Sequence, residues 1–385
     1  MKPSALRALG AVACLIVATV AATWAPSLDT ASPILRSAAP VRLTSSIDHA
    51  SQSNPSIANS SPLAYSLVAG DGGIFNGGDA GFYGSTGSLH LNQPIVGMAA
   101  TRAGASTQGY CGTRTGTPTT SKVMVIYEEN ADASSIYGSS SAPNINRYAD
   151  SCGAALNYQA LTHPSLPNYL ASTSGQSYDT SPWTTDCDPG GSCLTGNDNI
   201  FNQVGPSGWK SYVESMTSNC QVGSSGAYAT KHNPAAYYTD VHPQCLTNDV
   251  PLGSTWAGAL HDDVSAGTLP TFSTVTPDLN NDMHDGPLSQ ADSWLAGWMS
   301  QIVAGPDYRS GRLTVVIVWD EGSGSSVGAA STVAMIAVSP YIVPGTRSST
   351  YFTHYSLLKA AEDVAGVPEL GGAATAGDLR AAFGF

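Results

Sequence analysis

The fold class is decided by the stretch LTVVIVWDEG at residues 313–322, where an unbroken apolar and β-branched run stops at an acidic pair. The stretch VMVIYEEN at residues 123–130 has the same form. Apolar runs of this length are typical of parallel strands that are buried on both faces. In an open α/β sheet the ligand crevice lies at the carboxyl ends of the strands. We therefore expect the polar residues after both runs to meet at one site and to offer oxygen ligands to a cation. They are Glu129, Asn130, Asp320 and Glu321.

Strands and amphipathic helices alternate over the later part of the chain. A third strand is predicted at residues 333–338. A helix with Ser289 as its N-cap is predicted from one apolar face. That face comprises Leu288, Trp294, Leu295, Trp298, Met299 and Ile302. Another helix is predicted over residues 355–364, because Gly366 follows its end. His354, which precedes this helix, is predicted to be a structural or capping histidine. This alternation predicts a three-layer α/β/α sandwich.

The first 118 residues have a different texture from the α/β part, which we expect to begin at residue 119. Residues 1–25 have the pattern of a secretory signal peptide, and an uncleaved anchor is the alternative. The anchor is disfavoured because the apolar stretch is shorter than the roughly 20 residues that span a bilayer. Residues 26–62, rich in Ser, Ala, Pro and Asn, predict a disordered linker. Residues 63–118 are glycine-rich, predict β-hairpins, and form a single repeat-like extension.

Composition limits the partners of this chain. Its 385 residues are 42% hydrophobic and 11% charged, which suits one substantial core with an appendage. A formal net charge of -13 leaves no basic surface for nucleic acid or for anionic lipid. No segment after the N-terminal stretch is apolar enough to span a membrane. The sequence therefore excludes nucleic-acid binding and stable membrane insertion.

The cysteines predict a disulfide framework. All but Cys14 lie later in the chain, at Cys111, Cys152, Cys187, Cys193, Cys220 and Cys245. An even number of cysteines in an exported chain is typical of disulfides. A zinc knuckle is excluded because no two cysteines are separated by two residues. Short loops favour pairing 187 with 193 and 220 with 245, which leaves 111 with 152. We expect all three bridges to brace loops near the site.

A turn between the two apolar runs, THPSLPNY at residues 162–169, carries the candidate nucleophile Ser165. Prolines on both sides of the serine fix the turn and can hold the hydroxyl toward the cation site. The alternative interpretation is a rigid loop without chemistry. A hydrolase triad is disfavoured because no Gly-x-Ser-x-Gly elbow surrounds the serine.

Histidines supply candidate acid–base groups. In the turn NNDMHDG at residues 280–286, His284 could donate to an anionic oxygen or protonate a leaving group. Either Asp282 or Asp285 would fix its tautomer. A hydrogen-bonded loop is the alternative interpretation. His232 is a second candidate, and His163 is a third because it lies in the turn that carries the serine.

Several motifs appear in the order seen in the bacterial phosphoesterase family, which joins phosphatidylcholine-type phospholipases C to secreted acid phosphatases. They are Glu129-Asn130, His163 to Tyr169, Tyr228 to Pro234, Pro277 to Gly286, Trp319 to Gly322, and Ser339-Pro340-Tyr341. The chain resembles this family over residues 120–370. The form of the serine turn, with His-Pro-Ser, resembles the acid-phosphatase branch more than the phospholipase branch.

The resemblance implies an alkaline-phosphatase-like fold and a phosphoesterase domain at residues 119–385. It implies one divalent metal ion, calcium in the first place with manganese or zinc as alternatives. The implied metal ligands are Glu129, Asn130, Ser165, Asp320 and Glu321. Ser165 would attack phosphorus and form a phosphoseryl intermediate. The side chains implied around the phosphate are His163, His232 and His284.

The residues and the resemblance together predict a secreted, metal-dependent acid phosphatase that hydrolyses phosphomonoesters. Its substrate would be a small phosphate ester or a phospholipid headgroup, met outside the cell or at the cell surface. A phospholipase C-type phosphodiesterase is the alternative enzyme. A cell-surface binding protein built around the glycine-rich stretch is the non-enzymatic alternative.

Overall fold

The computed structural model describes residues 65–68, 74–77, 109–324, 326 and 330–385. The chain divides into two compact units, Met1–Ala100 and Thr101–Phe385. In the first unit, β1 (Tyr65–Val68) pairs antiparallel with β2 (Ile74–Gly77), so a β-hairpin forms where the glycine-rich stretch predicts one. The expected signal peptide and linker, and the other predicted hairpins, lie outside the described residues.

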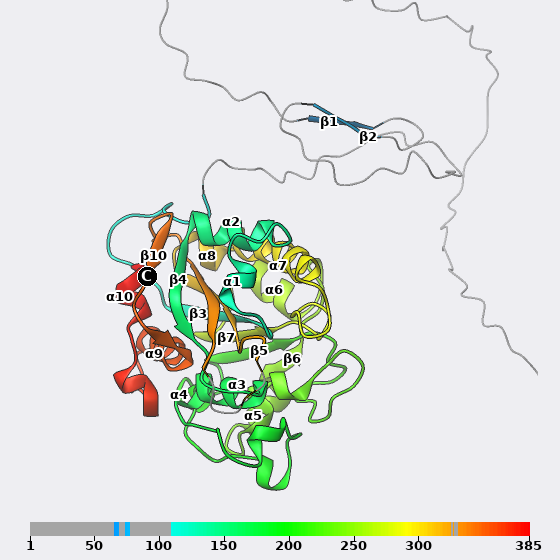
Figure 1. The fold of residues 1–385 in the computed structure, drawn as a ribbon, viewed down its shortest axis with the longest axis vertical. Coiled ribbons are helices and arrows are strands. Elements are labelled where there is room, and N and C mark those ends of the chain that lie inside the picture. Colours follow the sequence, from blue (N-terminus) through cyan, green and yellow to red (C-terminus); the bar gives the residue numbers. More distant parts are fainter. Residues whose placement is uncertain (1–64, 69–73, 78–108, 325, 327–329) are drawn as a thin grey trace, which may run out of the picture. The chain divides into compact units, whose positions relative to one another are not determined.

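The second unit is built around a nine-stranded sheet (Figure 1). The strands lie in the order β10-β4-β9-β8-β3-β7-β5-β6, and β11 pairs with β4. They are β3 (Lys122–Glu128), β4 (Gly153–Gln159), β5 (Trp209–Val213), β6 (Asp249–Pro251), β7 (Phe272–Thr276), β8 (Leu313–Trp319), β9 (Thr332–Val338), β10 (Thr346–Ser348) and β11 (Phe352–Thr353). β9 is antiparallel to both of its neighbours, whereas the other pairs are parallel. The parallel strands therefore end at one common edge.

The two predicted apolar runs form neighbouring strands at the centre of this sheet. β3 and β8 are parallel and in register, with Glu128 opposite Trp319. Their apolar side chains are buried. Because both strands end in step, the residues after them leave the sheet at the same level. The backbone N–H of Asp320 donates to the Glu128 carbonyl at 2.9 Å. The prediction of parallel strands buried on both faces is confirmed.

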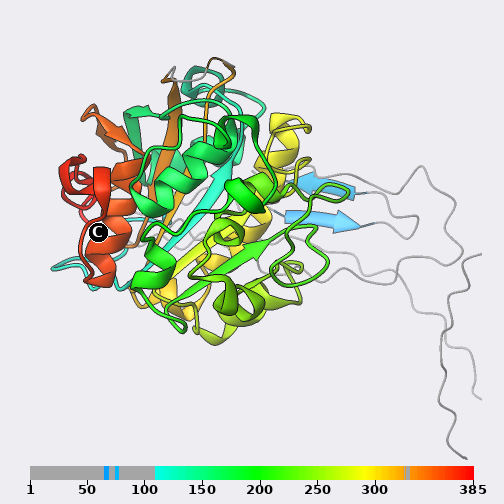
Figure 2. The same cartoon turned by 90° about the horizontal axis from the view of Figure 1, so that it is seen from below.

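Helices cover both faces of the sheet, so the three-layer α/β/α sandwich is confirmed (Figures 1 and 2). On one face α3, α4 and α9 pack together, and on the other α2, α6, α7 and α8 do. The α-helices are α1 (Ala133–Ile136), α2 (Pro143–Ser151), α3 (Ser165–Ser174), α4 (Ile200–Gln203), α5 (His242–Asn248), α6 (Ala259–Ala266), α7 (Leu288–Ile302), α8 (Pro306–Arg309), α9 (His354–Ala365) and α10 (Leu379–Phe383). Short 3-10 helices occupy Trp183–Thr185, Gly191–Cys193, Thr230–His232, Pro234–Tyr237 and Gly371–Thr375. In the described part of the chain, none of the helices combines the length and the apolar character needed to cross a bilayer.

The other predicted elements are present, with differences in detail. The predicted third strand is β9. It is antiparallel to its neighbours, and an apolar run does not indicate the direction of a strand. The predicted N-cap Ser289 was wrong: the N-cap is the extended Pro287, two residues earlier, and α7 begins at Leu288. Proline fixes its own backbone and cannot continue a helix toward the N-terminus, which sets that start. α9 is present and is one residue longer at each end than predicted; its C-cap is Gly366, which has the left-handed φ of 70° typical of a helix C-terminus.

All three predicted disulfides are present: Cys111–Cys152, Cys187–Cys193 and Cys220–Cys245. The expectation that all of them lie near the site was wrong for the first. Cys152 directly precedes β4, so that bridge lies at the amino ends of the parallel strands. It ties the segment that enters the second unit to the start of a core strand.

Candidate active site

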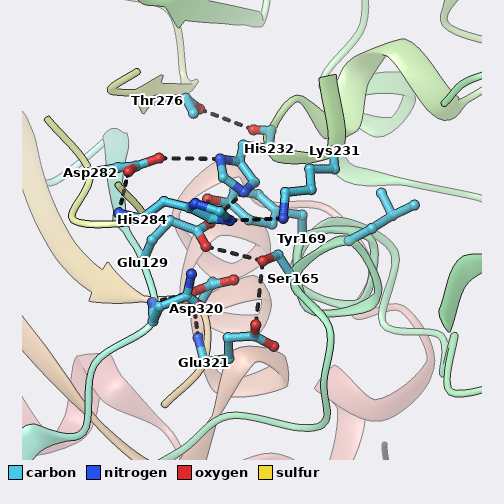
Figure 3. Close-up of polar contacts among 12 residues, drawn as sticks. Glu129, Ser165, Tyr169, Lys231, His232, Thr276, Asp282, His284, Asp320 and Glu321 are labelled. Carbon is cyan, nitrogen blue, oxygen red and sulfur yellow. Dashed lines mark hydrogen bonds and ion pairs between the residues drawn. The ribbon is translucent and has the colours of Figure 1, made fainter. Parts of the chain in front are cut away.

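The carboxylates that follow β3 and β8 meet at the carboxyl edge of the sheet (Figure 3). Asn130 has a left-handed φ of 55°, a conformation that asparagine tolerates better than most residues. The chain turns there directly after Glu129, and the Asn130 N–H donates to Asp320 Oδ1 at 3.3 Å. The same oxygen accepts the N–H of Glu321 at 2.6 Å.

Ser165 is the first residue of α3 and lies between two of these carboxylates. Its Oγ is 3.1 Å from Glu129 Oε2 and 3.4 Å from Glu321 Oε1. The N-terminus of a helix carries partial positive charge, which favours an anion at this position. Ser165 is only 1% exposed, so its hydroxyl faces the acidic cluster rather than open solvent. The structure therefore brings the predicted nucleophile to the predicted cation ligands.

Tyr169 belongs to the site although the sequence did not single it out as a site residue. Its hydroxyl donates to Glu129 Oε1 at 2.5 Å, and its ring stacks on His232 with centroids 5.3 Å apart. Tyr169 follows Ser165 by four residues on α3, and residues at this spacing share one helix face. That spacing was the signal that could have identified it. Both oxygens of Glu129 are therefore held by one helix.

His163 contacts the other carboxylate beside the serine. Its Nδ1 lies 2.9 Å from Glu321 Oε2, and its side chain is buried. Burial lowers the pKa of His163. Its Nε2 faces Gly324, where a Cβ would lie only 3.1 Å away. The geometry suits a residue that orients Glu321.

His232 lies between two buried carboxylates. Its Nε2 is 3.1 Å from Glu129 Oε1, and its Nδ1 is 3.2 Å from Asp282 Oδ2. Burial, followed by the charge of Lys231, holds the pKa of His232 well below its usual value. Burial raises the pKa of Asp282 to about 7. The ligand atoms of Glu129, His232 and Asp282 lie within 4.8 Å of one another, so these residues form a second set that could hold a cation.

His284 is the most exposed of the three site histidines, with 28% of its side chain accessible. Its Nδ1 is 2.8 Å from Asp285 Oδ1, and its Nε2 is 3.1 Å from Lys231 Nζ. An ammonium group can only donate, so Nε2 accepts and the ring proton lies on Nδ1. Asp285 therefore fixes the tautomer. Asp282 instead accepts the backbone N–H of His284 at 2.7 Å.

Lys231 and Asp186 complete the site, and neither was predicted as a site residue. Lys231 Nζ is 3.1 Å from Asp186 Oδ2, and Asp186 Oδ1 accepts the N–H of Leu166 at 3.0 Å. Together with His284 they line a cavity of about 340 Å³, whose wall continues along residues 224–226. The cavity therefore borders the site on the side of Lys231 and His284.

The cluster holds more acidic groups than a buried site accommodates without a counter-ion. Burial raises the pKa of Asp320 to about 7, and burial together with Asp320 raises that of Glu321 to about 9. Burial and Asp320 also hold the pKa of Glu129 well above its usual value. Among the described residues, Asp320 Oδ2 has no hydrogen-bond partner although it is buried. A divalent cation with oxygen ligands would satisfy these groups, so the residues fit the expected metal.

His354 supports the cluster from behind. Its Nε2 is 2.6 Å from the Asp320 carbonyl oxygen, and its Nδ1 is 3.1 Å from the Tyr158 hydroxyl. The cap of α9 is Thr353, so His354 is structural rather than a cap. This contact fixes the backbone that carries Asp320.

Comparison with known proteins places the chain in a family. The model of the Phosphoesterase family matches residues 123–368, more than half of the chain and close to the span of the resemblance. The phosphatidylinositol-3-phosphatase of Mycobacterium tuberculosis is 33% identical over 262 residues, which cover 67% of this chain and 81% of that protein. A probable acid phosphatase of Kluyveromyces lactis is 28% identical over 262 residues, which cover 65% of this chain and 59% of that protein. The chain thus spans less than two thirds of the length of this fungal relative.

Among solved structures, the chain is similar to a Vibrio parahaemolyticus protein of the alkaline phosphatase superfamily. The TM-score is 0.46 and the identity 11%, with 70% of this chain and 72% of that chain covered. The family match and the mycobacterial relative show the relationship from sequence. The chain belongs to the Phosphoesterase family.

Proposed function

We propose that the protein is a metal-dependent phosphatase that hydrolyses phosphomonoesters through a phosphoseryl intermediate on Ser165. As a member of the Phosphoesterase family it hydrolyses phosphoric esters. The observation that carries the proposal is the position of Ser165 Oγ at the start of α3, 3.1 Å from Glu129 and 3.4 Å from Glu321. A nucleophile, proton acceptors and oxygen ligands for a cation then lie in one place.

In the first half-reaction Ser165 Oγ attacks phosphorus, and the bond between phosphorus and the ester oxygen breaks. Glu129 Oε2 is the nearest acceptor for the serine proton, at 3.1 Å. The ester oxygen takes up a proton from solvent and leaves as an alcohol, while the phosphoryl group stays on Ser165. The N-terminus of α3 faces the developing charge on the phosphoryl oxygens.

In the second half-reaction water attacks the phosphorus of phosphoserine. His284 Nε2 is placed to accept a proton from that water, because Asp285 holds the other ring nitrogen as the N–H. The bond between phosphorus and Oγ breaks, Oγ takes back the proton held by Glu129, His284 returns its proton to solvent, and inorganic phosphate leaves. His163 and His232 lie against Glu321 and Glu129, with Nδ1 2.9 Å from Glu321 Oε2 and Nε2 3.1 Å from Glu129 Oε1.

The proposed cofactor is one divalent metal ion, calcium in the first place with manganese or zinc as alternatives. Its proposed ligands are Glu129, Asn130, Ser165, Asp320 and Glu321. When bound, the ion would offset negative charge on the serine and phosphoryl oxygens. Asp320 Oδ2 is buried and has no hydrogen-bond partner among the described residues, which supports a cation at this position.

The proposed substrate is a small phosphate ester or a phospholipid headgroup. A phosphomonoester is favoured over the diester of a phospholipase C because the relatives are a phosphatidylinositol-3-phosphatase and a probable acid phosphatase. The test is the hydrolysis of p-nitrophenyl phosphate and of p-nitrophenyl phosphorylcholine by the metal-loaded protein. Preference for the monoester supports the proposal, and preference for the choline diester supports the phospholipase alternative. Hydrolysis of neither leaves the binding-protein alternative.

We also propose that the protein is secreted, with its mature part outside the cell or at the cell surface. The three disulfides support an oxidising compartment. The proposed organisation is a signal peptide at residues 1–25, a linker, the glycine-rich extension and a phosphoesterase domain from residue 119. Deleting residues 26–108 spares Cys111 and its bridge, and should leave hydrolysis intact. Loss of surface attachment in that variant would assign attachment to the extension.

A further inference from the structure

The proposed site is acidic, yet its substrate is an anion. The acidic cluster consists of four buried carboxylates, those of Glu129, Asp282, Asp320 and Glu321. Lys231 lies beside this cluster, because the next residue, His232, has its Nε2 3.1 Å from Glu129 Oε1. Within the described residues, the other lysines that form ion pairs are paired with carboxylates outside this cluster. Those pairs are Lys122 with Asp307, Lys210 with Asp263, and Lys359 with Glu369.

Two contacts hold the ammonium group of Lys231 in place, but they do not use all of its hydrogen-bond donors. Its Nζ contacts Asp186 Oδ2 at 3.1 Å. It also contacts His284 Nε2 at 3.1 Å, as Figure 3 shows. An ammonium group has three hydrogens, and these two partners take two of them. Within the described residues, one hydrogen is therefore left for a ligand. Lys231 lines the cavity of about 340 Å³ together with both partners. A ligand in this cavity therefore contacts a wall that carries the ammonium group.

Asp186 couples this cation to the nucleophile. Its Oδ2 faces Lys231, while its Oδ1 accepts the N–H of Leu166, the residue after Ser165. One carboxylate therefore sets the position of the ammonium group relative to the N-terminus of α3. Asp186 is itself anchored, because the next residue is Cys187 of the Cys187–Cys193 bridge.

We propose that Lys231 binds the phosphoryl group of the substrate and that Asp186 is the positioning residue that holds Lys231 for this task. The inference rests on the proposed function. It names Lys231 as the group by which the site distinguishes a dianionic monoester from a monoanionic diester. A lysine ammonium serves as a point charge for phosphate. When Lys231 turns to the phosphoryl oxygens, it releases His284 Nε2, which then accepts the proton of the attacking water.

The first test replaces Lys231 with methionine, which keeps the length of the side chain and removes the charge. Lys231→Met should weaken the binding of inorganic phosphate to the full-length, metal-loaded protein by about 10- to 100-fold, measured by calorimetry. The kcat/KM for p-nitrophenyl phosphate should fall about 10-fold more than that for a p-nitrophenyl diester. Lys210→Met is the matched control, because Lys210 also forms a partly exposed lysine–aspartate pair, 2.7 Å long, with Asp263. This control should bind phosphate like the wild type.

The second test separates a positioning role from a merely structural one. Asp186→Asn keeps an oxygen for the Leu166 N–H but removes the charge that faces Lys231. Phosphate binding should weaken by only about 2- to 5-fold, because the ammonium group remains. The preference for the monoester should fall in the same direction as in Lys231→Met. This variant keeps the inference testable if Lys231→Met does not fold.

The outcomes separate this inference from the proposed function. If the wild type hydrolyses the monoester while both variants keep wild-type phosphate binding and wild-type preference, the inference is overturned and the proposed function stands. An equal loss on monoester and diester would also overturn it, since that result indicates a structural role. If the metal-loaded wild type neither binds phosphate nor hydrolyses the esters, the proposed function and the inference both fail.

Discussion

Replacing Asp249 with asparagine should remove part of the pH dependence of folding stability. Asp249 is completely buried, and its Oδ2 accepts the side-chain N–H of Asn233 at 2.8 Å. Its Oδ1 has no hydrogen-bond partner within the described residues. Asn233 directly follows His232, so this pair also fixes the turn that carries a site histidine.

The sign and size of the effect follow from the carboxyl group. Burial, opposed by the Asn233 hydrogen bond, raises the pKa of Asp249 from 3.8 to about 7. Below the unfolded value both states are protonated and the group has no effect. As pH rises further, the unfolded chain releases the proton while the folded protein keeps it, so stability falls until the folded pKa is passed. A shift of about three units at about 1.4 kcal/mol each gives a total loss on the order of 4 kcal/mol.

The assay is urea unfolding of the wild type and Asp249→Asn at pH 5 and pH 8, followed by circular dichroism. Relative to the wild type, the variant should gain about 3 kcal/mol between these pH values, because asparagine does not titrate. Asp240→Asn is the control, since Asp240 also pairs with an asparagine, Asn199, but is exposed. It should keep the wild-type pH dependence. Parallel stability profiles for the wild type and Asp249→Asn would refute the reasoning.

Three other predictions concern the site and its frame. Asp320→Asn, or treatment with a chelator, should lower metal occupancy and activity together, because Asp320 supplies charged oxygen to the cation; full turnover by verified metal-free protein would contradict the metal assignment. Tyr169→Phe should lower kcat about 10-fold or more while the fold is kept, because a charge-assisted hydrogen bond to Glu129 is lost. A wild-type kcat would show that Tyr169 does not act on the reaction. Mass mapping without reduction should find no free thiol between residues 111 and 245, and two free cysteines there would contradict the disulfide framework.

The centre of the sheet was predictable because burial leaves a direct trace in sequence. Every position of β8 is buried on one face or the other, so apolar residues continue until the strand leaves the core at Asp320. The polar residues after the run then mark the edge where a site can form. The direction of β9 leaves no such trace, because a buried antiparallel strand is equally apolar. The start of α7 was misjudged because Ser289 resembles a cap, while the backbone of Pro287 sets the boundary.

The site was predictable only in part, because some contacts are made by the fold alone. Asp186 lies 20 residues from Leu166 and 45 from Lys231 along the chain, yet it contacts both. No local pattern indicates such a contact. Tyr169 differs, because its spacing from Ser165 on one helix could have been used. The acid–base role of His284 was predictable from its local turn, whereas the placement of His163 and His232 around the phosphate came from the family resemblance.

The formation of phosphoserine at Ser165 is the central claim, and one measurement tests it directly. The wild-type protein is incubated with a labelled phosphomonoester, quenched in acid and mapped by mass spectrometry. The account predicts phosphate on the peptide that contains Ser165, and none on Ser165→Ala, whose kcat should fall on the order of 10³-fold or more with the fold unchanged. His284→Ala should change the rate at which the phosphopeptide forms or disappears. Near wild-type turnover by a folded Ser165→Ala variant, without a phosphopeptide in the wild type, would contradict the account and point to direct attack by water.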